Sequence, residues 1–213
     1  MAEIVVMGAS RGIGLETVKA ALDAGHGVRA FARSANSIPY VHERLAKIAG
    51  DALDRAAVEK AVTGADGVIQ AIGVTGGTEL LGGTKLFSSS TRVLVDAMQA
   101  AGVKRLVAVT GIGAGDSRGR GGMLYDLFLF PLVLKRVYDD KDVQERMIRS
   151  SGLDWTIARP GILVDKPVRG SVQALTDPAT WHASPVARAD VARFLVREFV
   201  ERKYLRETPL LIA

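Results

Sequence analysis

The chain has 213 residues, of which 48% are hydrophobic and 6% aromatic, so we expect residues 1–213 to fold as one domain whose interior is Val, Ile, Leu and Ala. It contains no cysteine, which excludes disulfides, zinc–thiolate sites and thiol nucleophiles, and we expect no metal site. The 28 basic and 23 acidic residues give a net charge of +5, but the basic residues are scattered, which argues against a nucleic-acid partner.

Short β-branched runs alternate along the chain with segments of helical period, a pattern typical of repeated βαβ units around a parallel sheet. The expected strands are residues 4–7, 28–32, 45–49, 67–72, 106–109, 155–158 and 210–212. The expected helices carry Leu15, Val18, Ala21 and Leu22, then Val58 and Val62, then Leu86 to Ala101, then Val143, Met147 and Ile148, and finally Val191, Phe194, Leu195 and Phe199, these last four facing inward. We therefore predict an α/β Rossmann fold, a doubly wound, mostly parallel sheet with helices on both faces.

Two observations bear on location. The charged Glu3 and the short apolar run at 4–7 leave no secretory leader, so we expect a cytoplasmic protein. The apolar segment 123–134 is too short to cross a bilayer and is interrupted by Asp126 and Pro131, so we expect no membrane contact. We interpret this segment either as a wall or lid of a substrate pocket or as a helix packed in the core or in a dimer.

A glycine-rich turn, Gly-Ala-Ser-Arg-Gly-Ile-Gly at residues 8–14, lies between the first strand and the first helix. The N–H groups at a helix N-terminus attract anions, and glycines permit a sharp turn and the close approach of a pyrophosphate. The spacing differs from the usual Gly-x-Gly-x-x-Gly, but the position between strand and helix supports the same interpretation. We predict dinucleotide contacts from Gly8, Ser10, Arg11, Gly12, Ile13 and Gly14, with a purely structural turn as the alternative.

The same turn also fits Gly-x-Ser-x-Gly, the nucleophile elbow of α/β-hydrolases, with Ser10 as the nucleophile. An elbow serine follows several strands and is completed by an acid and then a histidine, whereas Ser10 follows the first strand. Of the three histidines, His26, His42 and His182, only the last comes late enough, and no obvious acid-bearing strand end precedes it. A hydrolase is therefore a distant third hypothesis.

The end of the second strand indicates which dinucleotide binds. It reads Phe-Ala-Arg-Ser at 31–34, without the acid that usually holds the ribose hydroxyls of NAD. Arg33 can pair with a 2′-phosphate, and Arg11 can approach the same phosphate from the other side, so we predict NADP(H), with NAD possible. Asp51 either accepts a hydrogen bond from the adenine amino group or serves as a turn or N-cap residue.

Five segments together resemble the atypical short-chain dehydrogenase/reductase superfamily: residues 7–14, 50–51, 109–114, 151–161 and 188–192. The resemblance covers nearly the whole chain and is strongest to its NAD(P)H-binding, NmrA-like and flavin-reductase (biliverdin reductase B)-like group. It implies a nucleotide across the carboxyl ends of strands one, four and five, with the nicotinamide near Thr110 and Pro160. It also implies cofactor contacts at the end of the fourth strand, from Ala71, Ile72 and Gly73.

Superfamily members with full dehydrogenase chemistry use a Ser or Thr at the end of strand five and a Tyr four residues before a Lys. The lysine's charge lowers the pKa of the tyrosine, which then passes a proton at neutral pH. Thr110 is in place, but Tyr138 precedes Lys141 by three residues, and Tyr125 has Leu129 where a lysine is needed. The pattern is therefore incomplete.

We predict three catalytic residues: Thr110 to polarise or orient, Lys141 to contact the ribose or nicotinamide, and Tyr138 as a weaker candidate acid. The alternative for Lys141 is an exposed ion pair with Glu145 on the next helical turn.

This incomplete pattern favours a particular substrate class. Reducing an unactivated ketone needs an acid, whereas flavins and quinones accept hydride into a conjugated system and can take protons from water. We expect an NADP(H)-dependent oxidoreductase that acts, as a monomer or homodimer, on a small conjugated acceptor such as a flavin or quinone. The alternative is a redox-sensing regulator that binds the dinucleotide without turnover, as NmrA-like proteins are thought to do.

Overall fold

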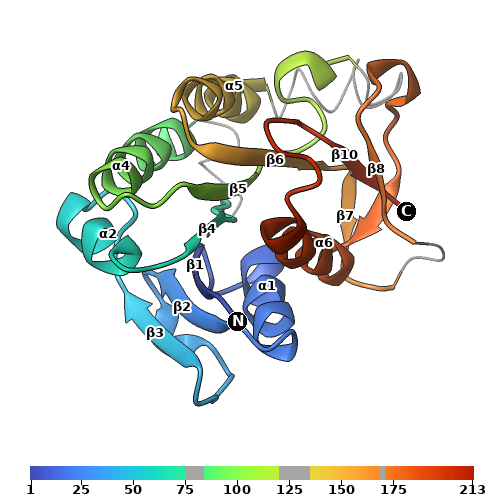
Figure 1. The fold of residues 1–213 in the computed structure, drawn as a ribbon. Helices are drawn as coiled ribbons and strands as arrows, with labels where there is room; N and C mark the ends of the chain where they lie inside the picture. The colour runs from blue at the N-terminus through green and yellow to red at the C-terminus, as the bar shows by residue number, and fades with distance from the viewer. Residues whose placement is uncertain (75–83, 120–134, 168–170) are drawn as a thin grey trace.

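The computed structural model describes residues 1–74, 84–119, 135–167 and 171–213, and its centre is a twisted sheet (Figure 1). This sheet has eight strands in the order β3-β2-β1-β4-β5-β6-β10-β8, and β7 and β9 form a separate pair. The strands are β1 Glu3–Met7, β2 Gly27–Ala32, β3 Leu45–Ala49, β4 Gly67–Gln70, β5 Arg105–Val109, β6 Asp154–Pro160, β7 Ile162–Val164, β8 Gln173–Leu175, β9 Pro185–Ala187 and β10 Leu210–Ile212. The helices are α1 Gly12–Asp23, α2 Arg55–Val62, α4 Leu86–Ala100, α5 Lys135–Ser150 and α6 Arg188–Glu201, with short 3₁₀ turns at Ala35–Ser37, Gly115–Ser117 and Pro178–Thr180.

The sheet is parallel from β3 to β10, and only the edge strand β8 runs antiparallel to its neighbour. Every residue of β5 is buried, as expected for strands covered on both faces. Because parallel strands need crossover connections, α-helices follow most of them along the chain, whereas β2 and β3 are joined through the 3₁₀ turn at Ala35–Ser37. The predicted Rossmann-type fold is confirmed.

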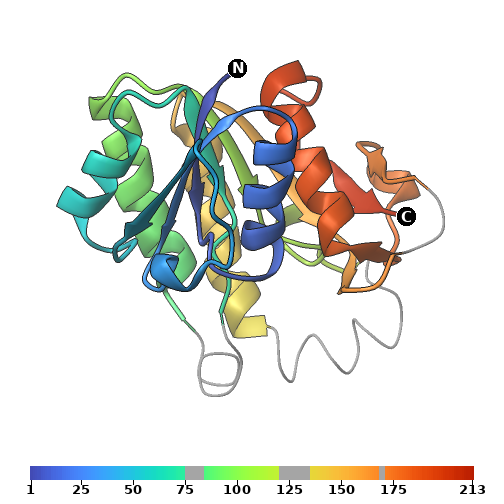
Figure 2. The ribbon, with the colours of Figure 1, turned by 90° about the horizontal axis from the view of Figure 1, so that it is seen from below.

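Two helical layers cover the sheet, with α1 and α6 on one face and α2, α4 and α5 on the other (Figures 1 and 2). Successive side chains of a strand point to opposite faces, so β1 contributes to both cores. Ile4 and Val6 pack with residues of α1 and α6, whereas Val5 and Met7 pack with residues of α2 and α4. The four inward-facing residues predicted for the last helix are all buried.

The differences from the sequence prediction lie in short or polar segments. The fourth strand ends at Gln70 rather than at residue 72, although the Ala71 N–H still donates to the Met7 carbonyl of β1. Strands β7, β8 and β9 were not predicted, because three residues are too few to show a β period. The proposed wall or lid at 123–134 lies outside the described residues.

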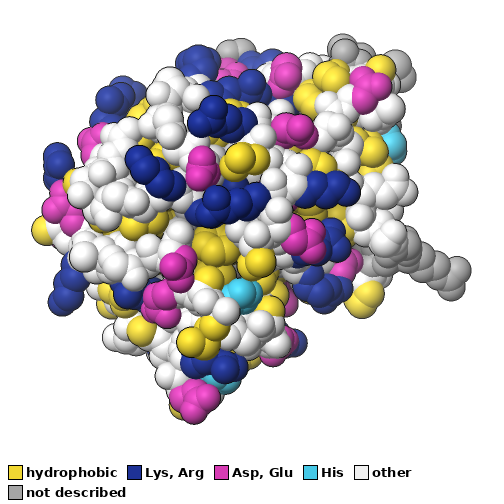
Figure 3. Space-filling model, viewed as in Figure 1, with side chains coloured by type: hydrophobic (Ala, Val, Ile, Leu, Met, Phe, Trp, Pro, Cys, Tyr) yellow, Lys and Arg dark blue, Asp and Glu magenta, His cyan; other side chains and the backbone are white. Residues whose placement is uncertain are grey.

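The surface and the helices add two observations. Basic and acidic side chains are interspersed on the face shown in Figure 3, in line with the scattered charge of the sequence. Within the described ranges, no helix combines the length and the apolar character that crossing a membrane requires.

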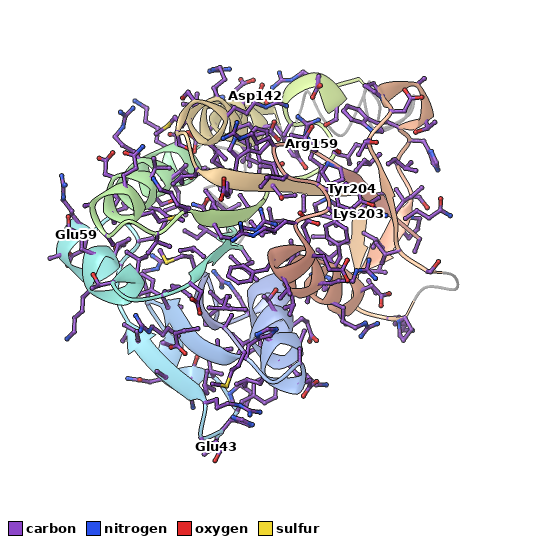
Figure 4. The ribbon with its side chains drawn as sticks, in the orientation of Figure 1. Glu43, Glu59, Asp142, Arg159, Lys203 and Tyr204 are labelled. Carbon is purple, nitrogen blue, oxygen red and sulfur yellow. The ribbon has the colours of Figure 1, made fainter. Side chains whose placement is uncertain are left out.

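A buried ion pair joins the sheet to α6. Arg105 on β5 and Glu198 on α6 are almost fully buried, and the Arg105 Nη2 donates to Glu198 Oε1 at 2.9 Å. The Arg105 guanidinium also donates to the Thr156 hydroxyl and to the backbone carbonyls of Asp154 and Glu198. Glu198 accepts further hydrogen bonds from the Thr156 hydroxyl and from the backbone N–H of Tyr204, which Figure 4 labels. Burial lowers the pKa of Arg105, and the charge of Glu198 opposes this effect.

We expect Glu198→Ala to destabilise the fold strongly, because it leaves the Arg105 guanidinium buried without its counter-charge. A loss of about 3–5 kcal/mol in the free energy of unfolding is typical for breaking such a pair. Urea denaturation followed by circular dichroism measures the change. The matched control is Glu201→Gln on the same helix, where an exposed carboxylate is removed and the change should stay within about 0.5 kcal/mol. Equal effects of the two substitutions would contradict this role of the buried pair.

Candidate functional site

The glycine turn is set by the close approach of α1 to β1. Gly8 has a φ of +82°, and its N–H donates to the carbonyl oxygen of Phe31 at 2.9 Å. A β-carbon on Gly14 would overlap the carbonyl oxygen of Gly8, so no larger residue fits at this position without a shift of the backbone. Gly14 does not line the cleft described below. Its part in the site is to let the helix pack against the strand.

The N-terminus of α1 offers unpaired backbone N–H groups. The N-cap residue Arg11 makes no side-chain capping hydrogen bond, and the first turn contains no acidic residue. The first backbone hydrogen bond of the helix runs from the Leu15 N–H to the Arg11 carbonyl, so the N–H groups before Leu15 have no carbonyl partner within the helix. A β-carbon on Gly12 would meet no atom within 4 Å, which shows that this turn faces open space. These features suit a phosphate group.

This open space is part of a cleft of about 1180 Å³ at the carboxyl ends of the parallel strands. The predicted site residues that line it are Gly8, Ser10, Arg11, Gly12, Ile13, Arg33, Asp51, Ala71, Ile72, Gly73, Thr110, Lys141 and Pro160. Gly14 and Tyr138 do not line it. Segments from most of the chain thus meet in one cavity large enough for a dinucleotide and a small second molecule.

One end of the cleft lies beside β2 and β3. Arg11 and Arg33 are both exposed there, and neither forms an ion pair with a described residue. Asp51 accepts a hydrogen bond from the Leu53 N–H at 2.9 Å, so it holds a turn while lining the cleft. The N-cap of α2 is Asp54 rather than Asp51. Of the two structural alternatives for Asp51, the turn is therefore correct.

The other end of the cleft is bounded by Thr110, directly after β5. Its hydroxyl donates to Glu145 Oε1 at 2.8 Å, and both side chains are buried. Glu145 in turn accepts two hydrogen bonds from the Arg159 guanidinium, at 3.0 and 2.6 Å. Since a hydroxyl has one hydrogen, the Thr110 hydroxyl is committed to Glu145 as a donor and presents only lone pairs elsewhere.

Arg159 connects this end of the cleft to the loop after β5. It is fully buried on β6, where Figure 4 labels it, and forms an ion pair with Asp116 at 2.5 Å. Partial burial raises the pKa of Asp116, but the Arg159 guanidinium more than offsets this effect, so the pKa lies below its usual value. Asp142 on α5, also labelled in Figure 4, fixes the same loop by accepting the Gly115 N–H at 2.6 Å.

Lys141 on α5 is buried and lines the cleft. Its Nζ donates to the Thr110 carbonyl oxygen at 2.7 Å and lies 4.5 Å from the centre of the Phe87 ring. Burial lowers its pKa to about 8, although Glu145 and Asp140 act in the opposite direction. The alternative of an exposed ion pair between Lys141 and Glu145 is wrong, because both are buried and Glu145 pairs with Arg159.

Tyr138 lies one turn before Lys141, and its ring centre is 5.9 Å from the Lys141 Nζ. A β-carbon on Gly111 would lie 2.8 Å from its hydroxyl oxygen, so this hydroxyl sits against the backbone next to Thr110. The structure thus places Tyr138 beside the two other predicted catalytic residues but outside the cleft lining. A role as proton donor remains a prediction.

Several lining residues were not predicted. They are Phe31, Ala32, Ser34, Gly50, Ala52, Leu53, Val74, Thr84, Lys85, Leu86, Ser89, Val109, Leu163 and Arg188. Most are small or apolar residues next to predicted ones and carry no signal of their own. Arg188 is different, because it begins the segment 188–192, which belongs to the family resemblance. In the described ranges, no group of three or more His, Cys, Asp or Glu side chains could hold a metal ion.

Solved structures with the same fold include two bacterial proteins that match nearly the full chain. An anaerobilin reductase from Escherichia coli O157:H7, ChuY, superposes with a TM-score of 0.79 at 24% identity, covering 99% of this chain and 96% of that one. A short-chain dehydrogenase/reductase from Veillonella parvula, solved in complex with NADP, superposes with a TM-score of 0.82 at 20% identity, covering 100% of this chain and 94% of that one. At these identities the likeness shows the fold.

Sequence comparison adds a curated relative and a family. An uncharacterized chloroplastic protein of Arabidopsis thaliana is 29% identical over 140 residues, which are 66% of this chain and 48% of that protein, so the alignment spans about half of the relative's length. The model of the NAD(P)H-binding family matches residues 8–202, from the glycine turn to the end of α6. The chain therefore belongs to the NAD(P)H-binding family.

Proposed function

We propose that this protein is an NADP(H)-dependent reductase that transfers hydride to a small conjugated acceptor such as a flavin or a quinone. The family supports dinucleotide binding, and oxidoreductases occur among the proteins of the same fold. The glycine turn would hold the pyrophosphate, and Thr110, Lys141 and Pro160 would surround the nicotinamide. Bound NADPH would supply the hydride, while the residues of the chain orient both reactants.

The observation that carries this proposal concerns the end of the cleft beside Thr110. No described side chain there is positioned as the proton donor for a substrate oxygen. Among the described residues, no tyrosine, histidine or glutamate lines the cleft, and the Lys141 ammonium, which does line it, donates to the Thr110 carbonyl and is assigned to the ribose. The Thr110 hydroxyl gives its hydrogen to Glu145 and is not free to donate to a substrate oxygen. A ketone needs such a donor for its developing alkoxide, whereas a conjugated acceptor delocalises the charge and can be protonated by water.

Two features favour the phosphorylated dinucleotide. Arg33 and Arg11 lie at the end of the cleft next to β2, and no acid follows that strand to hold ribose hydroxyls. A guanidinium group can bind a 2′-phosphate through two parallel hydrogen bonds. The relative from Veillonella parvula was crystallised with NADP, which agrees with this assignment.

A second candidate function is a redox sensor that binds the dinucleotide without turnover. The same lack of an acid favours it, because a binding protein needs no proton donor. The two candidates differ in whether an acceptor is reduced.

We expect the purified protein to oxidise NADPH when it is mixed with flavins and quinones. Consumption of NADPH at 340 nm measures the rate, with acceptor alone and protein alone as blanks. Simple ketones should give rates lower by about 100-fold or more, the usual contribution of a general acid. Tight NADPH binding without turnover across the panel would favour the sensor instead.

Arg33→Asp should reverse or remove the preference for NADPH, because a carboxylate would repel the 2′-phosphate. We expect the NADPH affinity to fall at least tenfold relative to NADH, which is about 1.4 kcal/mol. Isothermal calorimetry with both dinucleotides measures the two affinities. Arg44→Asp, which alters an exposed arginine outside the cleft, is the matched control. An unchanged ratio in Arg33→Asp would remove the phosphate contact from the proposal.

The affinity for NADPH should fall as the pH rises through about 8. Burial lowers the pKa of Lys141 to about this value, so its ammonium loses the charge that strengthens hydrogen bonds to the ribose. We expect about a threefold or larger loss between pH 7 and pH 9, a range above the phosphate pKa of about 6. In Lys141→Met the affinity should be weaker and nearly independent of pH. A wild-type profile that is flat over this range would contradict the role of Lys141.

A further inference from the structure

The charged side chains that line the cleft are nearly all positive. Among the described residues they are Arg11, Arg33, Lys85, Lys141 and Arg188, against the one described carboxylate of Asp51. Such a cleft concentrates anions. In the proposed function the dinucleotide phosphates account for Arg11 and Arg33, and the ribose accounts for Lys141. Lys85 and Arg188 have no part in that scheme, and of these two Arg188 is held by an ion pair that the structure describes.

The second sheet fixes the position of Arg188. Strands β7 and β9 are parallel, with Val164 opposite Ala187. The residues that follow, Asp165 and Arg188, therefore leave the sheet at the same edge, and the Arg188 Nη1 donates to Asp165 Oδ1 at 2.6 Å. Arg188 lines the cleft together with Leu163, which stands three residues after Pro160. It thus lines the cleft where β7 and the start of α6 meet it.

An anion that enters the cleft can displace Asp165 from its ion pair with Arg188. The Asp165 side chain is 88% exposed, and that of Arg188 is 29% exposed. Asp165 does not line the cleft, whereas Arg188 does. Exposed ion pairs contribute little stability, so a carboxylate or phosphate entering the cleft can take the place of Asp165 at little cost. A guanidinium binds either group through two parallel hydrogen bonds.

We propose that Arg188 recognises an anionic group, a carboxylate or a phosphate, on the electron acceptor, and that Asp165 occupies the guanidinium until the acceptor arrives. This inference rests on the proposed function and adds the charge of the acceptor to it. The substrate is then an anionic conjugated molecule whose ring system lies near Pro160 and Leu163. The competing source of the anion is the dinucleotide itself, whose pyrophosphate would reach Arg188 instead.

Two flavins with the same ring system test this proposal. FMN carries a phosphate on its side chain, whereas lumiflavin carries no charged group. Their affinities are measured by fluorescence quenching with the protein saturated with NADP⁺, so that no turnover is needed. We expect wild-type protein to bind FMN more tightly than lumiflavin, and Arg188→Gln to reduce this preference about fivefold or more. Asp165→Asn should increase it, because the competing carboxylate is removed.

The control is Arg193→Gln, which removes an arginine on α6 that pairs with Asp190 and lies outside the cleft. This variant should keep the wild-type preference. The affinity of Arg188→Gln for NADPH, measured by calorimetry, should stay within about twofold of wild type, the scatter expected for a surface change. A comparable loss of NADPH affinity would assign Arg188 to the dinucleotide and overturn the proposal. A wild-type protein that binds the two flavins equally, or neither, would overturn it as well.

Assays of flavin reduction, run beside the binding measurements, distinguish a failure of the anion site from a failure of the reductase proposal. If the wild-type protein prefers FMN through Arg188 but reduces no acceptor, the reductase proposal fails while the anion site stands. If it reduces both flavins and binds them with equal affinity, the reductase proposal stands and the anion site fails.

Discussion

The site depends on one steric constraint, the contact between the start of α1 and the end of β1. A β-carbon at Gly14 would overlap the Gly8 carbonyl, so the helix begins as close to the sheet as a backbone can. The first turn of α1, with its unpaired N–H groups, then faces the cleft at the carboxyl ends of the paired strands β1 and β4. Arg11, Arg33 and the end of β4 then converge on the same cleft. Without this close packing, the same residues would lie on separate loops.

The opposite end of the cleft is held by buried charge rather than by close backbone packing. Thr110 is oriented by Glu145, and Glu145 is oriented by Arg159, so strands β5 and β6 and helix α5 are tied at their cleft-facing ends. Lys141 fixes the same strand end by binding the Thr110 carbonyl. Buried ion pairs contribute modestly to stability but define geometry, because each partner is costly to leave alone. The polar groups at this end of the cleft therefore hold one another in place, and few of them are free to bind a ligand.

The sequence revealed the fold and most of the cleft because their signals are local. Glycines at a strand–helix junction, an absent acid after β2 and the period of apolar residues all act within a few positions. Burial of charge could not be predicted in this way. Helix α5 carries Asp140, Lys141, Gln144 and Glu145 on its inward face, a pattern that a hydrophobicity period assigns to solvent. Their partners come from distant strands and from α4, as with Arg159 and with the Phe87 N–H, which donates to Asp140. The short strands β7 and β9 escaped detection for a different reason, since three residues show no period.

The three-residue spacing of Tyr138 and Lys141 leaves the tyrosine outside the cleft lining, which in the proposed function disfavours ketone reduction. Lys141 faces the cleft, so a residue three positions earlier faces a neighbouring direction, here the backbone at Gly111. The tyrosine then packs beside the strand end, and Pro160 and Leu163 line the cleft instead of it. An apolar surface of this kind selects by shape and stacking instead of by a hydrogen bond to one oxygen. In the proposed function, selectivity among conjugated acceptors would come from a charged side chain that lines the cleft, and Arg188 is the candidate for it.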